Sequence, residues 1–372
     1  NTSNVCKIHA IKNINISLIV IFIFPLFSII IPAYNVGTLI IECIESLFCQ
    51  TFRDFEIIII DDGSSDDTFD VCESLYIKYA SLQIILLHQT NLRQIAARMN
   101  GVDHANGEYC LFVDADDKLE KNALEAIYNS IQKYQADIVI FNGVRFWNGG
   151  ETPFWKHYRE YEYYMQNEDY LKFQQVSLTS DRFNNVWNKA FKRQVILNSK
   201  RYEDVSFLNV EEDFLMQLPW YDTAKNAVYI PMNLYRYRFN PNSVTNMKFN
   251  DQLFNMAVFL LSETFPYFEK WKVPNPEIIC NRQFFSRVSG ALKQFYLKGS
   301  GLSKCQKMKY LLDIANNNTF RQEYQKFDGC IKSKIGRLAL WLLYHRLWRL
   351  VLLLVEHDPK VHGKESGIVG IE

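Results

Sequence analysis

Several patterns that identify common classes of protein are missing from this sequence. No pair of histidines has the spacing of a zinc protease, and the Gly-Ser-Gly run at residues 299–301 follows no strand, so it is not a phosphate loop. The 41 basic and 41 acidic residues cancel, so no overall field favours nucleic acid as a partner. No internal repeat is found.

The cysteines also lack a recognisable pattern. None of the eight is part of a C-x-x-C pair, and several lie inside apolar helix or strand patterns, as buried reduced thiols do. This usage predicts a cytoplasmic protein. Apolar residues are plentiful instead: 48% of the chain is hydrophobic and 15% aromatic, which excludes disorder as the overall description of the chain. The 372 residues suffice for two domains, or for one large domain with an extension.

Up to residue 141, short apolar runs alternate with amphipathic stretches. The predicted strands are 27–31, 55–60, 84–87, 109–113 and 137–141. The predicted helices are 37–49, 68–79, 94–105 and 122–134. Such alternation is typical of βαβ units, and therefore of a Rossmann-like α/β fold with a mostly parallel central sheet flanked by helices.

After residue 143 the pattern changes. Residues 146–180 are rich in Trp, Tyr and Glu and show weak periodicity. Beyond them we predict helices at 188–198 and 213–221 and short strands at 227–230 and 234–237. From residue 249 the pattern is helical to the end, with breaks at Pro266, Pro274, Pro276 and 299–301.

Acidic runs follow the ends of predicted strands. An Asp-Asp pair at 61–62 follows strand 55–60, an Asp-Ala-Asp-Asp run at 114–117 follows strand 109–113, and Glu-Glu-Asp at 211–213 opens a helix. Open α/β folds bind their ligands at the carboxyl ends of their strands, so these carboxylates are expected at one edge of the sheet. A phosphorylated ligand would be repelled there unless a divalent cation lay between, so the arrangement predicts a metal-bridged nucleotide.

A series of motifs resembles one enzyme family. In order, they are FSIIIPAYN at 27–35, QTFRDFE at 50–56, IDDGSSDDT at 60–68, AARMNG at 96–101, ANGEY at 105–109, VDADD at 113–117, VWNK at 186–189, ED at 212–213, and YRYR at 235–238 followed by Ser243. Each is weak alone, but together, in this order and spacing, they make residues 27–245 similar to family 2 glycosyltransferases with the GT-A fold.

This resemblance implies an inverting glycosyltransferase of the bacterial surface-polysaccharide or lipopolysaccharide type. It would move a sugar from a UDP-sugar to a saccharide or lipid-linked acceptor. The implied organisation is a nucleotide-sugar-binding half at 27–145, an acceptor-binding and catalytic half at 146–248, and a helical extension at 249–372.

The base of the nucleotide is expected beside the first acidic pair. In the family, the residue at the position of Asp62 accepts the N3 proton of uracil, with Asp61 as its neighbour. Pro32, Ala33 and Tyr34 would form a wall around the base. The alternative is turn chemistry alone, because Asp-Gly-Ser is a favoured turn sequence.

The run at 114–117 matches the family's DxD motif, which implies Mg²⁺ or Mn²⁺ held by hard oxygen ligands. Asp116 would be the direct ligand, and Asp114 would meet the ribose, or the metal through water. Ala115 lies between them, and Asp117 is a further candidate ligand. The alternative, an N-cap cluster for the helix beginning at 122, explains one aspartate but not three.

Asp213 resembles the catalytic base of inverting members, which takes the proton from the attacking acceptor hydroxyl. Glu211 and Glu212 would raise its proton affinity by like-charge repulsion, so Glu212 is included in the catalytic group. The alternative is a helix N-cap with acidic residues in the first turn.

Arginines and one tryptophan complete the expected site. Arg98, Arg236 and Arg238 are candidate partners of the diphosphate, because guanidinium groups match phosphate geometry; each is otherwise an exposed surface charge. Trp187 is a candidate for stacking on a sugar ring, with core packing as the alternative.

One loop departs from the family pattern. The family often has Gly at the position of Arg93 and Ser at that of Ile95, so the loop that precedes Arg98 differs here from the family pattern.

Both ends of the chain carry apolar segments. The extension at 1–26 has two lysines before an apolar run, and three origins stay open: an adventitious extension, a membrane-surface anchor or a signal. The segment 332–356 is basic and apolar, with Trp341 and Trp348. It predicts an interfacial helix on the inner face of the cytoplasmic membrane, with a core helix as the alternative.

Two rival functions stay open at this stage. One is a non-catalytic, membrane-associated scaffold with the same fold, which the complete set of acidic positions argues against. The other is a nucleotidyltransferase, which lacks its Gly-rich signature loop here.

Overall fold

The computed structural model describes residues 24–202, 207–208, 210–239, 249–298 and 301–356. Nearly all of the extension at 1–26 therefore lies outside the described residues, as does Ser243 of the last motif.

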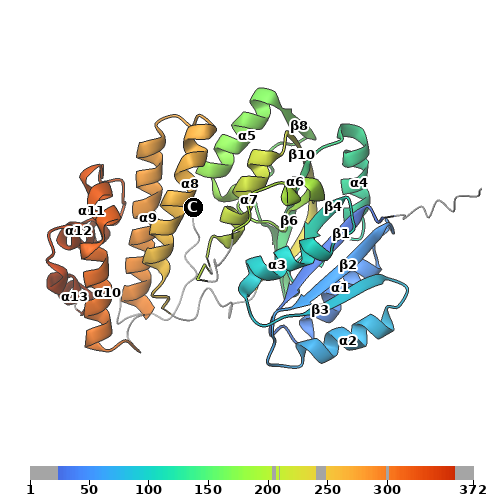
Figure 1. Ribbon diagram of the computed structural model, residues 1–372, viewed down its shortest axis with the longest axis horizontal. Coiled ribbons are helices and arrows are strands. Elements are labelled where there is room, and N and C mark those ends of the chain that lie inside the picture. The colour runs from blue at the N-terminus through green and yellow to red at the C-terminus, as the bar shows by residue number, and fades with distance from the viewer. Residues whose placement is uncertain (1–23, 203–206, 209, 240–248, 299–300, 357–372) are drawn as a thin grey trace, which may run out of the picture.

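A mixed central sheet runs through the chain from β1 to β10 (Figure 1). Four parallel strands stand side by side in the order β3 (Gln83–His88), β2 (Phe55–Asp61), β1 (Phe27–Ala33) and β4 (Tyr109–Phe112). β9 (Lys189–Lys192) runs antiparallel between β4 and β6 (Ile138–Trp147), and β10 (Asn226–Arg238) lies parallel to β6. Three short antiparallel strands complete the sheet: β5 (Lys118–Leu119), β7 (Gly150–Pro153) and β8 (Tyr163–Gln166). The predicted α/β sheet is confirmed, and all its long strands point the same way.

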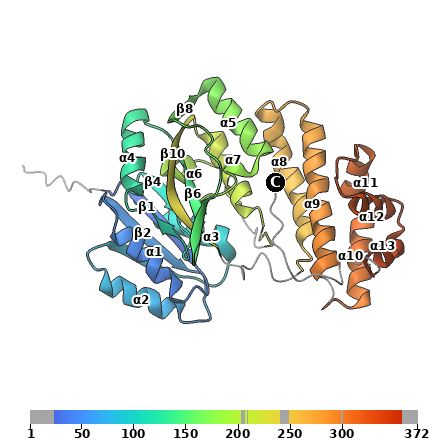
Figure 2. The same ribbon diagram turned by 180° about the vertical axis from the view of Figure 1, so that it is seen from behind.

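Helices cover both faces of this sheet (Figure 2). They are α1 (Leu39–Phe48), α2 (Thr68–Lys78), α3 (Arg93–His104), α4 (Ala123–Tyr134), α5 (Asn167–Thr179), α6 (Arg193–Leu197) and α7 (Glu212–Thr223), with a 3₁₀ turn, η1 (Asp181–Phe183). Side chains alternate between the faces: Ile29 and Ile31 pack with α1 and α4, whereas Ile30 packs with α3 and α7. The continuous isoleucine runs are therefore explained by burial on both sides.

The structure corrects several predicted elements. Residues 189–192, predicted as part of a helix, form β9, because Ala190 and Phe191 point to opposite faces of the sheet and enter different cores. β10 is one strand with register shifts rather than two short strands. Pro266 lies inside a helix and Pro276 begins one, as a proline can in the first turn.

The rest of the chain is helical, as predicted. It contains α8 (Leu253–Lys270), α9 (Pro276–Lys298), α10 (Lys304–Asn316), α11 (Asn318–Gln325), α12 (Lys334–Tyr344) and α13 (Trp348–Glu356). These helices share their own apolar core and extend away from the sheet, with α12 and α13 at the far end in both views (Figures 1 and 2). Within the described ranges, no helix has the length and apolar character needed to cross a membrane.

Helix α3 lies very close to the sheet at Gly101. A Cβ atom there would overlap the side chain of Ile30 and come within 2.9 Å of Ile60 Cδ1. Only glycine lets α3 approach this closely, which matters because α3 also carries Arg98.

We therefore expect Gly101→Ala to lower the midpoint of thermal unfolding, although alanine favours helices by about 0.5–1 kcal/mol. Overpacking typically costs about 1–3 kcal/mol, so the overlap should outweigh the helix propensity. The matched control is Gly290→Ala in α9, where an added Cβ meets nothing within 4 Å. The control should be neutral or stabilising; an equal gain at both positions would contradict the close approach.

Candidate functional site

The predicted acidic edge forms where β1, β2, β3 and β4 end. Asp62 is almost fully buried there and holds the loop that follows β3. Its carboxylate accepts hydrogen bonds from Gln89 Nε2 (2.7 Å) and from the backbone N–H groups of Leu92 and Arg93 (2.9 Å each). Asp62 thus fixes the entry to α3.

Arg93 explains why the family often has glycine at this position. Its φ angle is +74°, in the left-handed region that glycine adopts without a steric cost. The two backbone hydrogen bonds to Asp62 hold the loop in this conformation. The departure noted in the sequence is therefore accommodated without losing the loop.

The other expected base contacts differ in accessibility. Asp61 is fully buried and pairs with His88 Nδ1 at 2.7 Å, so its carboxylate faces the protein. Ala33 is buried and Pro32 is half-buried, whereas the Tyr34 side chain is 47% exposed at the end of β1. Of this group, Tyr34 presents an accessible ring.

One buried arginine joins the two parts of the site. Arg98 is 1% exposed. Its Nη2 donates to Asp114 Oδ1 at 3.0 Å, and its Nη1 donates to Asp213 Oδ1. The other oxygen of Asp213 accepts from the backbone N–H of Val186 at 3.1 Å. The structure therefore brings together the predicted DxD aspartate and the predicted base, and it pairs Arg98 with carboxylates instead of leaving it free for a diphosphate.

The cluster gathers three half-buried carboxylates, those of Asp114, Glu212 and Asp213, around the buried Arg98. Burial raises the pKa of Asp114 to about 6, with Asp213 adding to the effect and Arg98 opposing it. Burial and the charge of Asp213 raise the pKa of Glu212 to about 7. For Arg98, burial favours the neutral form, but Asp213 and Asp114 together raise its pKa above the ordinary value.

The side chain of Asp117 is used in hydrogen bonds within the protein. Its Oδ2 accepts from the Tyr235 hydroxyl at 2.7 Å and its Oδ1 from the Arg238 N–H at 2.6 Å, and it is 1% exposed. Tyr235 also accepts from the Asp114 N–H at 3.0 Å. These contacts hold the turn at 114–117, so we do not include Asp117 among the proposed metal ligands.

Asp114 and Asp116 fit the chemistry of a divalent cation. The residues that the structure describes contain no group of three or more His, Cys, Asp or Glu side chains arranged as a metal site. Mg²⁺ commonly uses one or two carboxylates together with substrate phosphates, and Mn²⁺ suits the same oxygen ligands. Burial raises the pKa of Asp116 as it does that of Asp114, and a bound cation would relieve this cost.

Other residues expected to contact the donor have partners within the protein. Arg236 donates to Glu120 (2.9 Å) and Glu151 (2.7 Å), so its charge is already paired within the protein. Trp187 is buried, and its ring stacks on that of Tyr235 with centroids 4.4 Å apart. The ring is therefore part of the core and cannot stack on a sugar. Arg238 lies near the DxD run but bonds the Asp116 carbonyl and Glu42.

The sequence did not indicate one ion pair beside the site. Glu211 is the N-cap residue of α7 and has a φ angle of +61°. Its carboxylate forms a two-pronged pair with Arg287 of α9 at 2.7–3.0 Å. The helical extension therefore holds the start of the helix that carries Asp213. In the sequence, the acidic run at 211–213 is the visible part of this pair. Its partner, Arg287, lies 76 residues after Glu211, so sequence spacing does not connect the two.

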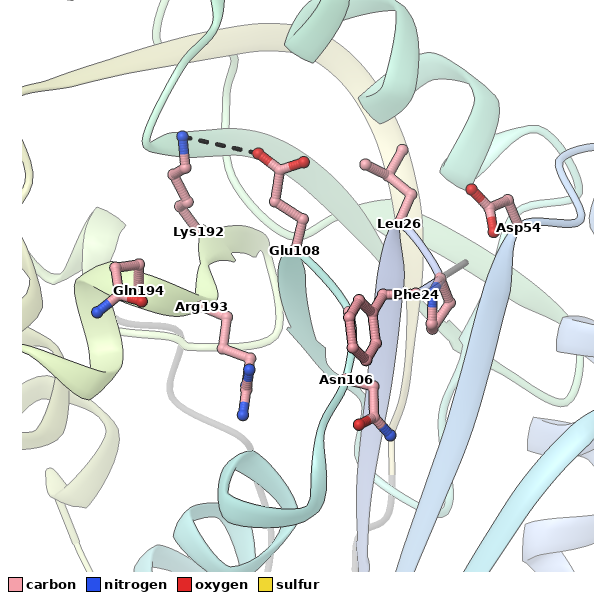
Figure 3. A pocket seen from close by; sticks show the side chains of 10 residues that line it. Phe24, Leu26, Asp54, Asn106, Glu108, Lys192, Arg193 and Gln194 are labelled. Atoms are coloured by element: carbon pink, nitrogen blue, oxygen red, sulfur yellow. Dashed lines mark ion pairs between the residues drawn. The ribbon is translucent and has the colours of Figure 1, made fainter. Parts of the chain in front are cut away.

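Cavities lie at two places in the described part of the chain. One, of about 460 Å³, lies beside the first turn of α7 and is lined by Ser177, Leu178, Thr179, Ser180, Asp181, Asn184, Glu211, Phe214, Gln283, Ser286 and Arg287. The other, of about 390 Å³, lies at the amino ends of the parallel strands, where Lys192 and Glu108 pair at 3.6 Å (Figure 3). That second cavity is at the opposite edge from the acidic site and takes no part in it.

Comparison with known proteins supports the motif assignment. The model of "Glycosyl transferase family 2" matches residues 28–196. The chain is 27% identical over 243 residues to Glycosyltransferase GlyG of Streptococcus pneumoniae, covering 60% of this chain and 74% of GlyG. It is 30% identical over 240 residues to the uncharacterized glycosyltransferase EpsJ of Bacillus subtilis, covering 60% of this chain and 64% of EpsJ.

The fold also has a solved counterpart. The structure of S. aureus TarS 1–349, in complex with UDP, is similar with a TM-score of 0.62 at 18% identity. The match covers 92% of this chain and 94% of that chain, so it includes the helical extension. The predicted GT-A fold with a helical C-terminal region is thereby confirmed.

The raised pKa of Glu212 predicts a pH dependence of stability. An unfolded glutamate has a pKa near 4.5, and the folded value is about 7. The folded protein binds the proton of Glu212 more tightly than the unfolded chain does, and this stabilises the folded state. The stabilisation is complete below about pH 4.5 and is lost as the pH rises through about 7. In metal-free buffer, the unfolding midpoint of Glu212→Gln should therefore rise relative to wild type across this window. Glu168→Gln, an exposed change in the first turn of α5, controls for loss of charge near a helix N-terminus; an equal trend in both would contradict the assignment.

Proposed function

Because the chain belongs to glycosyl transferase family 2 and is therefore a glycosyltransferase, we propose that it moves a sugar from a UDP-sugar to a saccharide or lipid-linked acceptor. The product would be a bacterial surface glycan. The observation that carries the proposal is the contact of one buried arginine, Arg98, with both Asp114 and Asp213. This contact supports a site in which Asp114 would meet the nucleotide and Asp213 would act as the base at the same reacting centre.

UDP is the proposed nucleotide. TarS, which shares the fold, has been solved with UDP and with UDP-GlcNAc. In this chain the exposed ring of Tyr34 would stack on the base beside Pro32 and Ala33. Asp62 would accept the uracil N3–H, since a carboxylate has more lone pairs than its three bonds use.

Asp116 and Asp114 are the proposed ligands of Mg²⁺ or Mn²⁺. A bound cation would offset the charge that develops on the departing diphosphate. The protein contributes the position of the two carboxylates: the bonds of Tyr235 to Asp114 and Asp117, and of Arg238 to the Asp116 carbonyl, hold the turn that carries them.

Asp213 is the proposed general base. The acceptor oxygen attacks the anomeric carbon opposite UDP, the bond from that carbon to the diphosphate oxygen breaks, and UDP leaves with the electron pair. The hydroxyl proton passes to Asp213. Arg98 and the Val186 N–H orient the carboxylate, and attack from the face opposite the leaving group gives inversion.

The acceptor is proposed to occupy the cavity beside α7. Its lining residues Glu211 and Phe214 flank Asp213 in sequence, and Asn184 lies two residues before Val186, whose N–H bonds Asp213. Hydroxyl, carboxylate and guanidinium groups in this lining suit the hydroxyls of a saccharide. For a lipid-linked acceptor, the reaction would take place at the inner face of the cytoplasmic membrane.

Binding of UDP should depend on the metal, because a diphosphate and two carboxylates meet at this edge. Calorimetric titration of UDP should give much weaker binding in EDTA than in Mn²⁺. Asp116→Ala should lose most of the gain from Mn²⁺, whereas Asp70→Ala, at an exposed position on α2, should keep it. Equal affinity for UDP with and without metal would contradict a cation that bridges the diphosphate and the two carboxylates.

Asp213→Asn should bind UDP normally and lose turnover, because the amide keeps the shape but accepts no proton. Loss of a general base typically lowers the rate about 10²- to 10⁴-fold. The measurement is UDP release from whichever of UDP-glucose, UDP-galactose and UDP-GlcNAc the wild type uses fastest.

The matched control for this change is Asp169→Asn, which removes an acidic residue from the first turn of α5. It should turn over like the wild type. A wild-type rate in Asp213→Asn would mean that this residue only stabilises the start of α7. No turnover in any of the three proteins would favour the scaffold alternative.

A further inference from the structure

The last two helices that the structure describes, α12 and α13, each carry an exposed apolar row. On α12 the row is Ile335, Leu338 and Trp341, each 43–45% exposed. On α13 and the turn before it, the row is Leu347, Leu350 and Leu353, each 41–49% exposed. The spacing of three residues places each row along one side of its helix.

These rows are not loosely packed core. The opposite sides of the same helices are fully buried: Ala339, Leu340 and Leu343 on α12, and Val351 on α13, belong to the core of the helical extension. Packing of these buried side chains fixes both helices in place, and the exposed rows take no part in that packing. Exposed apolar rows on helices whose other side is already packed are available to an interaction partner.

Between residues 331 and 354, the charged side chains are all basic. Residues 331–354 contain Lys332, Lys334, Arg337, Arg346 and Arg349 and no Asp or Glu. All of these cations except Arg337 are exposed by more than a third of their surface. The Trp341 ring lies against His345 with centroids 4.6 Å apart, so an aromatic edge borders the basic turn.

We propose that this face of α12 and α13 docks on a bilayer containing anionic lipids. Leucine, isoleucine and tryptophan side chains would enter the headgroup boundary, and the flanking cations would contact lipid phosphates. A second copy of the chain is a poor occupant, because two faces with five cations each would repel one another. Docking would bring the enzyme to a lipid-linked acceptor, and this purpose rests on the proposed function. Binding of the protein to a bilayer can nevertheless be measured without any turnover.

The test is co-sedimentation of the full chain with vesicles. Wild type should bind vesicles of equal parts phosphatidylglycerol and phosphatidylcholine, and bind much less to pure phosphatidylcholine. Arg346→Gln with Arg349→Gln should weaken binding on the order of tenfold or more, and added salt should weaken wild-type binding. Trp341→Ser with Leu350→Ser should weaken it at every salt concentration.

Matched variants change the same chemistry elsewhere. Lys304→Gln with Lys309→Gln alters two exposed cations on α10, and Ile77→Ser with Ile278→Ser alters two exposed apolar residues on α2 and α9. Both should bind as wild type does, and thermal unfolding of each variant verifies its fold. If the serine variant does not fold, the glutamine variant decides alone.

Three outcomes would overturn the proposal: no vesicle binding by wild type, equal binding by the α12–α13 variants, or a dimer in sedimentation that these variants abolish. Equal binding would assign the membrane contact to another part of the chain. All three leave UDP binding untouched, so they are distinguishable from a failure of the proposed enzymatic function.

Discussion

The buried guanidinium of Arg98 is the contact on which the candidate site depends. It carries a positive charge at almost zero exposure, and it persists there because Asp114 and Asp213 surround it. A charge removed from water needs paired and hydrogen-bonded partners, so the three side chains constrain one another. Through this contact α3, the end of β4 and the start of α7 are held in one arrangement, although they lie far apart in sequence.

Close packing makes that contact possible. Gly101 lets α3 lie against Ile30 and Ile60, and the Asp62 carboxylate fixes the loop that leads into the same helix. On the other side, the pair between Glu211 and Arg287 ties the N-cap residue of α7 to α9. The helical extension is thus part of the site's support as well as the carrier of an outer apolar face.

The strand and helix alternation up to residue 141 was predictable, because buried parallel strands appear as continuous apolar runs and each helix has an apolar side. The region from 146 to 200 was not: β9 is four residues long, and its strand conformation is imposed by pairing with β4 and β6 on either side. The backbone hydrogen bonds that residues 189–192 form with both neighbouring strands outweigh their local preference for a helix.

The sequence alone determined the family motifs, the order of the elements and the residues of the acidic edge, because these depend on local spacing and on which side chains follow a strand. Tertiary structure decided how those residues are used. It turned Asp117 towards Tyr235, buried Trp187 against the same ring, and paired Arg236 with Glu120 and Glu151. A side chain's partners depend on which distant segments fold beside it, and a motif records the residue but not those neighbours.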